Sequence, residues 1–587
     1  MASDIISLKG VTFSYKGSKR RALDGITLNV KQGECVAILG PTGAGKSTLA
    51  CVMNGTAPRF MDGSLAGDVT VDGMIPAKVG TAQMASRVGL VFGDPDTQLF
   101  GMTVEEDVAF GPANLGLGYE SIMERVGKSI GDMRLAGLER RAPHRLSGGQ
   151  KQATAIAGVY AMLPKIMVLD EPTSMLDPEG KARVFAIVRM LKEQLGVTVV
   201  LIEQEVDDIL TLADRVFVMR SGKFVLSGTP REVFGRVEEL RQAGVRVPQI
   251  VEFGTLIGAA ETPFTIEEAI SAIAPASAEE AVSGVTSAFA SVSEAANPAA
   301  APRASRAAQA DPVVEAVDVE FTYPGGARAL DGVNLAVGCG DFVAIVGQNG
   351  AGKTTLTRHF NGLLRPSSGD IRVLGRSTQG VPTIELCRHV GYVFQNPDEQ
   401  LFCTSVQEEL RFGPTNIGAD PGVTSQRVEE ILGDIGLTKY REVWPKYLTK
   451  GERQRLALAS VVAMDPDVLV VDEPTTGLDW VESLQILDYL ERLRNEQKKT
   501  IIIITHDMNI VSLYARRVVV MAKGRVVGDG TAREIFSQPD LMELACLRRP
   551  PIADLSQALW GEVLLTPAEA AARLLAAKSQ AAGVCSE

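Results

Sequence analysis

The chain has 587 residues, too many for a single hydrophobic core, and at roughly 100 to 200 residues per domain it predicts several domains. Its 71 acidic side chains outnumber its 59 lysines and arginines, and the formal charge of −12 argues against sequence-independent binding of nucleic acid, which requires a basic face. The seven cysteines show no CxxC spacing, so we expect reduced thiols and not a metal or disulfide framework. We expect neither a secretory signal nor a membrane span, because MASDIISLKG lacks a basic-then-apolar pattern and no run of about 18 apolar residues occurs.

The two halves of the chain repeat one pattern in the same order. Alternating strands ISLKGVTFSY and VEAVDVEFTY end at Tyr15 and Tyr323, and RALDGITL and RALDGVNL follow them. Later, TVEEDVAFGPANLG from Thr103 matches SVQEELRFGPTNIG from Ser405, and KIMVLDEPT matches DVLVVDEPT. A period of about 300 residues is far longer than that of any solenoid repeat. The sequence therefore predicts a duplicated domain.

The segment between the halves, from about Ser271 to Asp311, is rich in Ala, Ser, Pro and Glu and has few aromatic residues. Such a segment cannot bury enough apolar surface to offset its ordering entropy, so we expect a flexible linker. As a coil of about 40 residues it would span roughly 35 Å, enough for the two halves to meet. We therefore expect domains at residues 1–250 and 311–550, a tail helix and linker at 251–310, and a C-terminal helical tail at 551–587.

Helical tails are indicated by capping-box patterns at the end of each half. Thr265 is followed by Glu268, and Thr566 is followed by Pro567 at the first helical position and by Glu569. The sequence leaves open whether these tails serve packing or dimer contact.

Each half contains a glycine loop directly after an apolar strand, VAIL or VAIV. The loops read GPTGAGKS and GQNGAGKT, and this pattern after a strand is typical of a phosphate-binding loop, with a structural glycine turn as the alternative. In this interpretation Lys46 and Lys353 reach the β and γ oxygens of ATP, and Ser47 and Thr354 hold Mg²⁺. The residues expected to bind the nucleotide in the two loops are Gly40, Pro41, Thr42, Gly43, Ala44, Gly45, Lys46, Ser47 and Thr48, and Gly347, Gln348, Asn349, Gly350, Ala351, Gly352, Lys353, Thr354 and Thr355.

Paired acids end the apolar strands IMVLDE and VLVVDE. Asp170 and Asp472 suit Mg²⁺ binding through water, and Glu171 and Glu473 suit a general base or water-positioning role. A purely structural role is the alternative, and it is disfavoured because unpaired charge at the end of a buried strand is costly.

The stretch LSGGQ, from Leu146 to Gln150, resembles the signature of the ABC (ATP-binding cassette) ATPases. The resemblance implies an α/β fold of two P-loop cassettes, each with a RecA-like parallel-sheet core, an antiparallel β subdomain and a helical signature subdomain. It also implies that each signature completes the nucleotide site of the other cassette, with the two cassettes pairing within the chain, because a helix start is a ready anion site. The residues that match the two signatures are Leu146, Ser147, Gly148, Gly149 and Gln150, and Thr449, Lys450, Gly451 and Glu452 of LTKGE.

The resemblance to ABC ATPases assigns roles to four further residues. Tyr15 and Tyr323 match the aromatic residue that stacks on adenine, although both could be ordinary edge-strand aromatics. Asp177 and Asp479 match the D-loop aspartate of the family, although an aspartate in a loop is often only a turn former.

The two halves differ at positions that the family uses for catalysis. The second half has Gln395 at the Q-loop position, which also suits Mg²⁺, and His506 as the switch histidine. The first half has Gly93 and Gln204 there, and the second signature has Lys450 in place of a glycine. In the family, each site pairs the glycine loop of one cassette with the signature of the other. The departures at Gly93, Gln204 and Lys450 therefore all fall in the site of the first loop and the second signature. We therefore expect asymmetric hydrolysis, faster at the second loop with the first signature.

Within the superfamily, QNPDEQLF and VEEDVAFGPANLG resemble the ATPases of energy-coupling factor (ECF) transporters, which import vitamins and trace metal ions. The resemblance implies two partners, a membrane scaffold subunit and a membrane substrate-binding subunit, and a peripheral place on the cytoplasmic face of the membrane. The helices after Gly93 and Gln395 would receive the scaffold's coupling helices. One alternative is a soluble twin-cassette ATPase acting on ribosomes or DNA. A second alternative is a small-molecule kinase, but this function would leave LSGGQ and the duplication unexplained.

Overall fold

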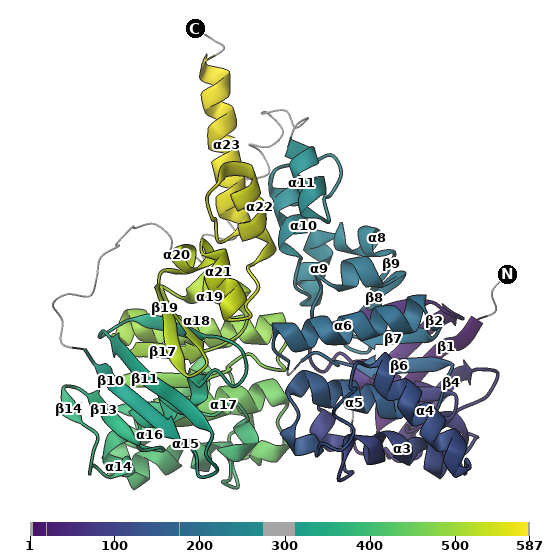
Figure 1. The fold of residues 1–587 in the computed structure, drawn as a ribbon, viewed down its shortest axis with the longest axis horizontal. Coiled ribbons are helices and arrows are strands. Elements are labelled where there is room, and N and C mark those ends of the chain that lie inside the picture. The colour runs from purple at the N-terminus through teal and green to yellow at the C-terminus, as the bar shows by residue number, and fades with distance from the viewer. Residues whose placement is uncertain (1–3, 19, 175, 274–311, 585–587) are drawn as a thin grey trace. The chain divides into compact units, whose positions relative to one another are not determined.

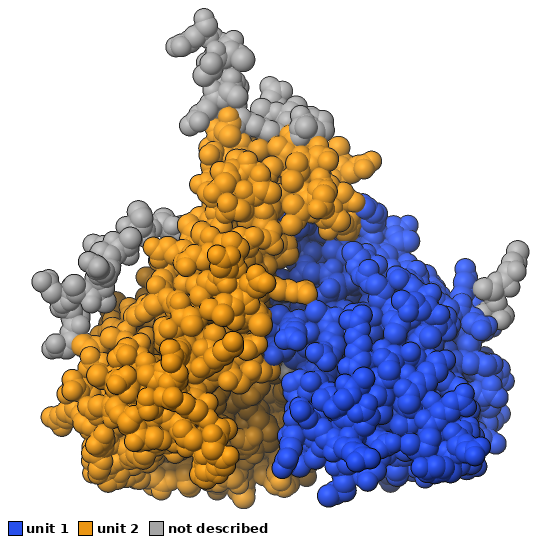
Figure 2. Space-filling model, viewed as in Figure 1, with its two compact units in different colours: residues 1–251, 479–481 blue, residues 252–478, 482–587 orange. Residues whose placement is uncertain are grey.

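The structure, a computed structural model, describes residues 4–18, 20–174, 176–273 and 312–584, apart from the side chains of Thr81 and residues 578–584. Its contacts divide the chain into two compact units, drawn in blue and orange in Figure 2. Unit 1 comprises Met1–Val251 with Asp479–Val481, and unit 2 comprises Glu252–Leu478 with Glu482–Glu587. Most of the predicted linker, from residue 274 to Asp311, lies outside the described residues. Within the described part of the chain, no helix is both long and apolar enough to span a bilayer.

Unit 1 is built on a six-stranded sheet in the order β5-β6-β7-β3-β8-β9, of which β6, β7, β8 and β9 are labelled in Figure 1. The first five of these strands run parallel, and β9 pairs antiparallel with β8. The parallel strands are short and have apolar, buried centres, as expected for strands covered on both faces. The six strands are β3 (Cys35–Leu39), β5 (Val88–Val91), β6 (Ile166–Asp170), β7 (Thr198–Ile202), β8 (Arg215–Arg220) and β9 (Lys223–Gly228).

A second, antiparallel sheet in unit 1 has the order β2-β1-β4, and its alternating strands bury one face. Phe13 and Leu23 on this face share one core with Ile38 of β3 and Val168 of β6. These strands are β1 (Asp4–Tyr15), β2 (Leu23–Lys31) and β4 (Gly63–Val71). Helix α1 (Lys46–Asn54), which follows the first glycine loop, packs against β5 and β6 of the parallel sheet.

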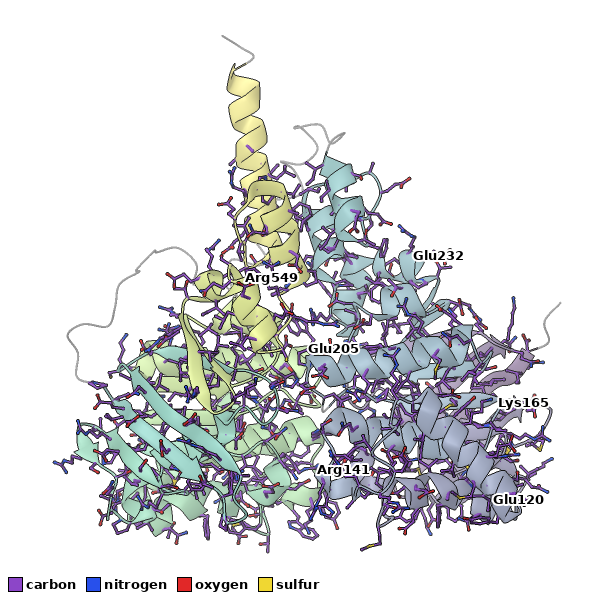
Figure 3. The ribbon with its side chains drawn as sticks, viewed as in Figure 1. Glu120, Arg141, Lys165, Glu205, Glu232 and Arg549 are labelled. Atoms are coloured by element: carbon purple, nitrogen blue, oxygen red, sulfur yellow. The ribbon has the colours of Figure 1, made fainter. Side chains whose placement is uncertain are left out.

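The remaining helices of unit 1 fall into two groups. Helices α3, α4 and α5 pack against one another, and α6 packs against α5. Short capped helices follow the last strand: Glu232, labelled in Figure 3, closes a capping box with Thr229 at the start of α8. The helices are α2 (Thr81–Ala85), α3 (Val104–Asn114), α4 (Tyr119–Asp132), α5 (Gly148–Tyr160), α6 (Pro178–Glu193), α7 (Ile209–Leu212), α8 (Pro230–Phe234) and α9 (Val237–Ala243). Helix α10 (Gln249–Leu256) begins in this unit and continues into the residues of unit 2.

Unit 2 repeats this plan. Its six-stranded sheet has the order β15-β16-β17-β12-β18-β19, and its antiparallel sheet has the order β11-β10-β13-β14. The strands are β10 (Val314–Thr322), β11 (Arg328–Val337), β12 (Phe342–Val346), β13 (Ser368–Val373), β14 (Arg376–Ser377), β15 (Val390–Val393), β16 (Val468–Asp472), β17 (Thr500–Ile504), β18 (Arg517–Ala522) and β19 (Arg525–Gly530). The helices are α13 (Lys353–Phe360), α14 (Thr383–Leu386), α15 (Val406–Asn416), α16 (Pro421–Asp434), α17 (Lys450–Val462), α18 (Trp480–Gln497), α19 (Met508–Tyr514), α20 (Ala532–Phe536) and α21 (Pro539–Leu544). The predicted pair of α/β cassettes with parallel-sheet cores and antiparallel subdomains is confirmed.

A helix follows each of the two capping-box patterns, and the glutamate of each pattern accepts from the residue before the threonine and not from the threonine itself. Thr265 Oγ1 accepts from the Glu268 amide at the start of α11 (Ile266–Ile273), and Thr566 Oγ1 accepts from the Glu569 amide at the start of α23 (Pro567–Val584). Within unit 2, α11 contacts α22 (Pro551–Trp560). Arg549, labelled in Figure 3, ties the start of α22 to the preceding helices.

Candidate nucleotide sites

Each glycine loop is closed so tightly that only glycine fits at its ends. A Cβ on Gly40 would lie 2.1 Å from the Met219 carbonyl oxygen, and one on Gly347 would lie 2.2 Å from that of Met521. Both glycines, and the loop glycines after them, have positive φ values. This backbone turns successive amides toward one side, which makes a cradle for phosphate oxygens.

The loop lysines lie folded over their own loops. Lys46 Nζ donates to the carbonyl oxygens of Gly40 and Pro41 at 2.7 and 3.1 Å, and Lys353 Nζ donates to those of Gly347 and Gln348 at 2.7 and 3.0 Å. Both ammonium groups are therefore held at the mouth of the loop, within reach of a bound phosphate.

In unit 2 the catalytic carboxylate candidate is paired with a histidine. His506 Nδ1 lies 2.9 Å from Glu473 Oε1 and 2.8 Å from Oε2, and Thr476 Oγ1 donates to Oε2 at 3.1 Å. Burial opposes the charge on Glu473, but His506, with help from Lys353 and Thr476, outweighs it and lowers the pKa of this carboxyl. Glu473 is therefore held ionised, as a base or water-positioning group must be.

In unit 1 the corresponding carboxylate has different partners. Gln204 Nε2 donates to Glu171 Oε1 at 2.9 Å, and Lys46 Nζ lies 3.2 Å from the same oxygen. The Glu171 side chain is 24% exposed, compared with 8% for Glu473. Gln204, unlike a histidine, cannot take up or release a proton near neutral pH.

Both glutamates share a strained backbone. Glu171 has φ +51° and Glu473 has φ +50°, in the left-handed region that non-glycine residues rarely adopt. Such strain persists only where the surrounding structure enforces it, and it clusters at functional sites. The duplicated cassettes have kept this backbone and changed the partner of the carboxylate.

The Q-loop positions also differ in their surroundings. A Cβ on Gly93 would lie 2.8 Å from the Glu171 carbonyl oxygen and 3.1 Å from that of Asp170, so a larger residue there would displace the loop. Gln395 follows β15 and is exposed, and no hydrogen bond joins its side chain to Thr354 or Asp472 in the described part of unit 2. Its assignment to Mg²⁺ therefore stays a prediction.

The two signatures form helix starts with complete caps. Ser147 and Gln150 form a capping box at the start of α5, and Thr449 and Glu452 form one at the start of α17. Lys450 replaces a signature glycine, and its Nζ occupies the space beside Gly477, where a Cβ would lie 2.1 Å away. The sequence variation in the second signature therefore leaves its helix start intact.

The D-loop and adenine-stacking candidates have defined contacts. Asp177 caps α6 by accepting from the Gly180 amide, whereas Asp479 Oδ2 accepts from the Thr42 amide at 2.8 Å within unit 1. The hydroxyls of Tyr15 and Tyr323 lie 2.9 and 3.0 Å from Thr48 Oγ1 and Thr355 Oγ1, at the start of the helix after each loop, and the rings are 37% and 39% exposed. Each ring therefore stands beside its phosphate loop with surface free to stack.

Comparison with known proteins assigns the family. The model of the ABC transporter family matches residues 23–174 and 330–476, just over half of the chain. The chain belongs to the ABC transporter family. It is 40% identical to a predicted ABC transporter ATP-binding protein of Caldanaerobacter subterraneus over 96% of this chain and 98% of that protein. It is 39% identical to another of Methanosarcina mazei over 94% of this chain and 93% of that protein.

A solved structure, that of cbiO1 from Clostridium perfringens, described as part of the ABC transporter complex cbiONQ, is 36% identical to this chain. The match covers 42% of this chain and the whole of the cbiO1 chain, with a TM-score of 0.38. As a member of the ABC transporter family, the chain has two ATP-binding cassettes and is an ATPase.

The ABC cassettes also offer groups that fit Mg²⁺. Thr354 Oγ1 donates to Asp472 Oδ2 at 2.9 Å, and Oδ1 of both Asp472 and Asp170 is buried with no hydrogen-bond partner among the described residues. Burial raises the pKa of Asp170 to about 6, despite a hydrogen bond from Ser47, and it also raises that of Asp472. A buried carboxylate oxygen without a partner calls for a cation or water, so these residues fit a Mg²⁺ ion that also binds phosphate oxygens.

Sequence reasoning missed two residues that contact these sites. Tyr392 OH donates to Asp472 Oδ2 at 3.0 Å. Glu203, 1% exposed, accepts from the Thr173 amide at 3.1 Å and from its hydroxyl at 2.7 Å. The signal for Glu203 was an acid directly after the apolar strand TVVLI, the pattern that found Glu171 and Glu473.

Proposed function

We propose that this ABC ATPase is the energy-coupling subunit of an ECF-type importer, peripheral on the cytoplasmic face of the membrane, and that it drives uptake of a vitamin or trace metal ion. The membrane scaffold and the substrate-binding component are separate subunits in this proposal. Two runs of sequence support it, QNPDEQLF and VEEDVAFGPANLG, which resemble ECF ATPases. The names of the relatives support transport in general.

The observation that carries the proposal is an exposed aromatic pair at the same place in each cassette. Phe100 and Phe110 meet edge to face with ring centroids 4.3 Å apart, and Phe402 and Phe412 do so at 4.6 Å. The four side chains are 45% to 63% exposed, although their pairing makes each pair one continuous apolar surface. Exposed apolar patches of this kind mark protein interaction sites, and these lie beside α3 and α15, where coupling helices are expected.

The partners can be identified by purifying the tagged chain from membranes in mild detergent and sequencing what comes with it. We expect small multi-span membrane proteins. The double substitution Phe100→Ser with Phe402→Ser should lower their recovery at least about ten-fold, since it removes a central aromatic contact from both cassettes. Phe60→Ser, at a phenylalanine that is 69% exposed outside these pairs, is the matched control and should change nothing. Co-purified ribosomal proteins or DNA would instead support the soluble alternative.

The proposal includes unequal hydrolysis at two composite sites. The faster site would combine the first signature, Ser147 and the glycine amides of LSGGQ, with Lys353, Thr354, Gln395, Asp472, Glu473 and His506. The first loop would bind ATP with Lys46, Ser47, Asp170 and Glu171 and hydrolyse it slowly with the second signature, where Lys450 stands in place of a glycine. The contrast between His506 and Gln204 as partners of the two carboxylates supports this division.

In each site Mg²⁺ would be held by the loop hydroxyl and by the strand-end aspartate, and it would supply positive charge to the phosphate oxygens. At the faster site, Glu473 would orient and deprotonate the attacking water, and His506 would keep Glu473 ionised and contact the γ-phosphate. Lys353 and the loop amides would stabilise the charge that develops on the transferred phosphate.

A further inference from the structure

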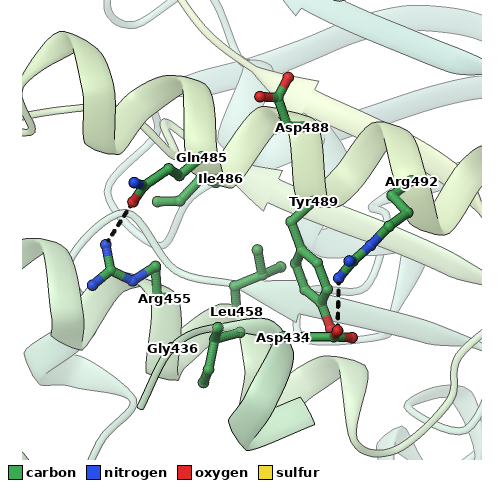
Figure 4. Close-up of a pocket in the computed structure, with 10 residues that line it drawn as sticks. Asp434, Gly436, Arg455, Leu458, Gln485, Ile486, Asp488, Tyr489 and Arg492 are labelled. Carbon is green, nitrogen blue, oxygen red and sulfur yellow. Dashed lines mark hydrogen bonds and ion pairs between the residues drawn. The ribbon is translucent and has the colours of Figure 1, made fainter. Parts of the chain in front are cut away.

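Unit 2 contains a cavity of about 530 Å³ outside both glycine loops (Figure 4). It lies between the end of α16, the middle of α17 and the middle of α18, so the helical part of the cassette forms one wall and the helix after Asp479 forms the other. This volume is within the range of pockets that bind small molecules.

One part of the cavity lining is apolar and aromatic. Leu458 and Ile486 line it between the two charged ends that Figure 4 shows, and the Tyr489 ring stands beside them. The Arg492 guanidinium lies 5.1 Å from the centre of the Tyr489 ring and pairs with Asp434 at 3.0 Å. Burial raises the pKa of Tyr489, so its hydroxyl stays neutral. This part of the lining suits an apolar or aromatic body.

The other part of the lining carries Arg455, for which the described residues supply no acidic partner. Arg455 donates from Nη1 to Gln485 Oε1 at 3.1 Å, and its Nε is buried with no hydrogen-bond partner among the residues that the structure describes. The two acids of the lining are already engaged, Asp434 by Arg492 and Asp488 by the Tyr514 hydroxyl at 2.6 Å. A guanidinium that lines a cavity and has no acidic partner among the described residues is well suited to pair with a carboxylate or phosphate oxygen.

The first cassette lacks this set of side chains. From Gly93 and Gln395 onward the motifs of the two cassettes are offset by 302 residues, as between Glu171 and Glu473. By this offset Arg455, Tyr489 and Arg492 correspond to Ala153, Ile187 and Met190. The polar lining is therefore specific to the second copy and is not required by the shared fold.

We propose that this cavity binds a small amphipathic anion, with one carboxylate, phosphate or sulfonate group on Arg455 and an apolar or aromatic body against Leu458, Ile486 and Tyr489. The anion pairs with the Arg455 guanidinium, and the body displaces water from the apolar wall. Such a ligand touches both α17, whose first turn carries the second signature, and α18, which follows Asp479.

The test uses two fluorescent probes on the full chain with saturating Mg·ADP. The first is 8-anilinonaphthalene-1-sulfonate, and the second is N-phenyl-1-naphthylamine, which has the same aromatic body without the anion. Arg455→Ala, which installs the residue of the first cassette, should weaken binding of the sulfonate about ten-fold, the usual cost of a lost charge-assisted hydrogen bond. Binding of the neutral probe should change less than two-fold.

Arg441→Ala is the matched control, because Arg441 is an arginine of the same unit that does not line the cavity. It should leave both probes unaffected. Arg455→Gln, closer in size to arginine, repeats the test if the alanine variant is unstable. Unchanged sulfonate binding in the Arg455 variants, an equal loss in Arg441→Ala, or an equal loss for the neutral probe would each overturn the proposal.

Discussion

The two strand ends that carry Glu171 and Glu473 have nearly the same backbone and different chemistry. Their φ values differ by one degree, and both glutamates follow a buried strand of identical length. Glu473 pairs with an imidazole, while Glu171 accepts from the Gln204 amide and lies beside Lys46. The comparison shows that the two cassettes share the backbone of this site and differ in the side chain that pairs with the glutamate, His506 in one and Gln204 in the other.

A hydrogen bond from this position does not by itself distinguish the two carboxylates, because each has one with the second residue after the neighbouring strand, Gln204 or His506. The difference is that a histidine can carry charge and exchange a proton, and an amide cannot. His506 lowers the pKa of Glu473 against the effect of burial. The first site has a lysine at the same carboxylate, but that lysine is also the one expected to bind phosphate.

The largest effect should come from the loop lysines. Lys353→Ala should lower ATPase activity about 10³-fold, because it removes a charged donor from the faster site, and Lys46→Ala should leave most of the activity. Each substitution should also remove one of two bound nucleotides in equilibrium dialysis with Mg·ATP. A wild-type chain that binds a single nucleotide, or two variants with equal activity, would break the comparison.

Exchanging the partners of the two carboxylates should have the next largest effect. His506→Gln, which installs the residue of the first cassette, should lower ATPase activity about 10²-fold through loss of the imidazole that pairs with Glu473 and contacts the γ-phosphate in the proposed site. Gln204→His, measured in a Glu473→Gln background, should raise the residual activity, since it gives Glu171 the partner of Glu473. If His506→Gln kept wild-type activity, the histidine would have no part in the asymmetry.

The parts of the fold that depend on short patterns could be predicted from sequence. The glycine loops, the apolar strands before them and the caps at Thr265 and Thr566 follow from local rules, and the structure has all of them. The contact of Gln204 with Glu171 could not be predicted, because it joins the ends of two strands that are far apart in the chain. The cavity beside Arg455 was missed for the same reason, since α16, α17 and α18 each supply only part of it.

A smaller effect concerns Glu203, which stands where the second cassette has Thr505. Burial first, and then the charges of Glu171 and Glu205, raise the pKa of Glu203 from 4.5 to about 7, although Thr173 donates to it. Between these values the unfolded chain releases a proton that the folded chain keeps, so stability falls as pH rises from about 4.5 to about 7 and then levels off. The loss is about 3 kcal/mol at roughly 1.4 kcal/mol per pKa unit.

Glu203→Gln should remove this fall, because the amide does not titrate. Calorimetric melting of the full chain at pH 5 and pH 8 measures it, and Glu124→Gln, at an exposed glutamate of unit 1, is the matched control. The same pH dependence in wild type and Glu203→Gln would show that the buried acid does not set it.

The central claim is that most ATP hydrolysis takes place at the site that contains Glu473. The most direct measurement is steady-state ATPase activity of Glu473→Gln and Glu171→Gln in the complex assembled with the membrane partners. Loss of a positioned base costs about 10² to 10⁴-fold, so Glu473→Gln should nearly abolish activity, while Glu171→Gln should retain a substantial fraction. Equal losses, or a larger loss from Glu171→Gln, would contradict the account.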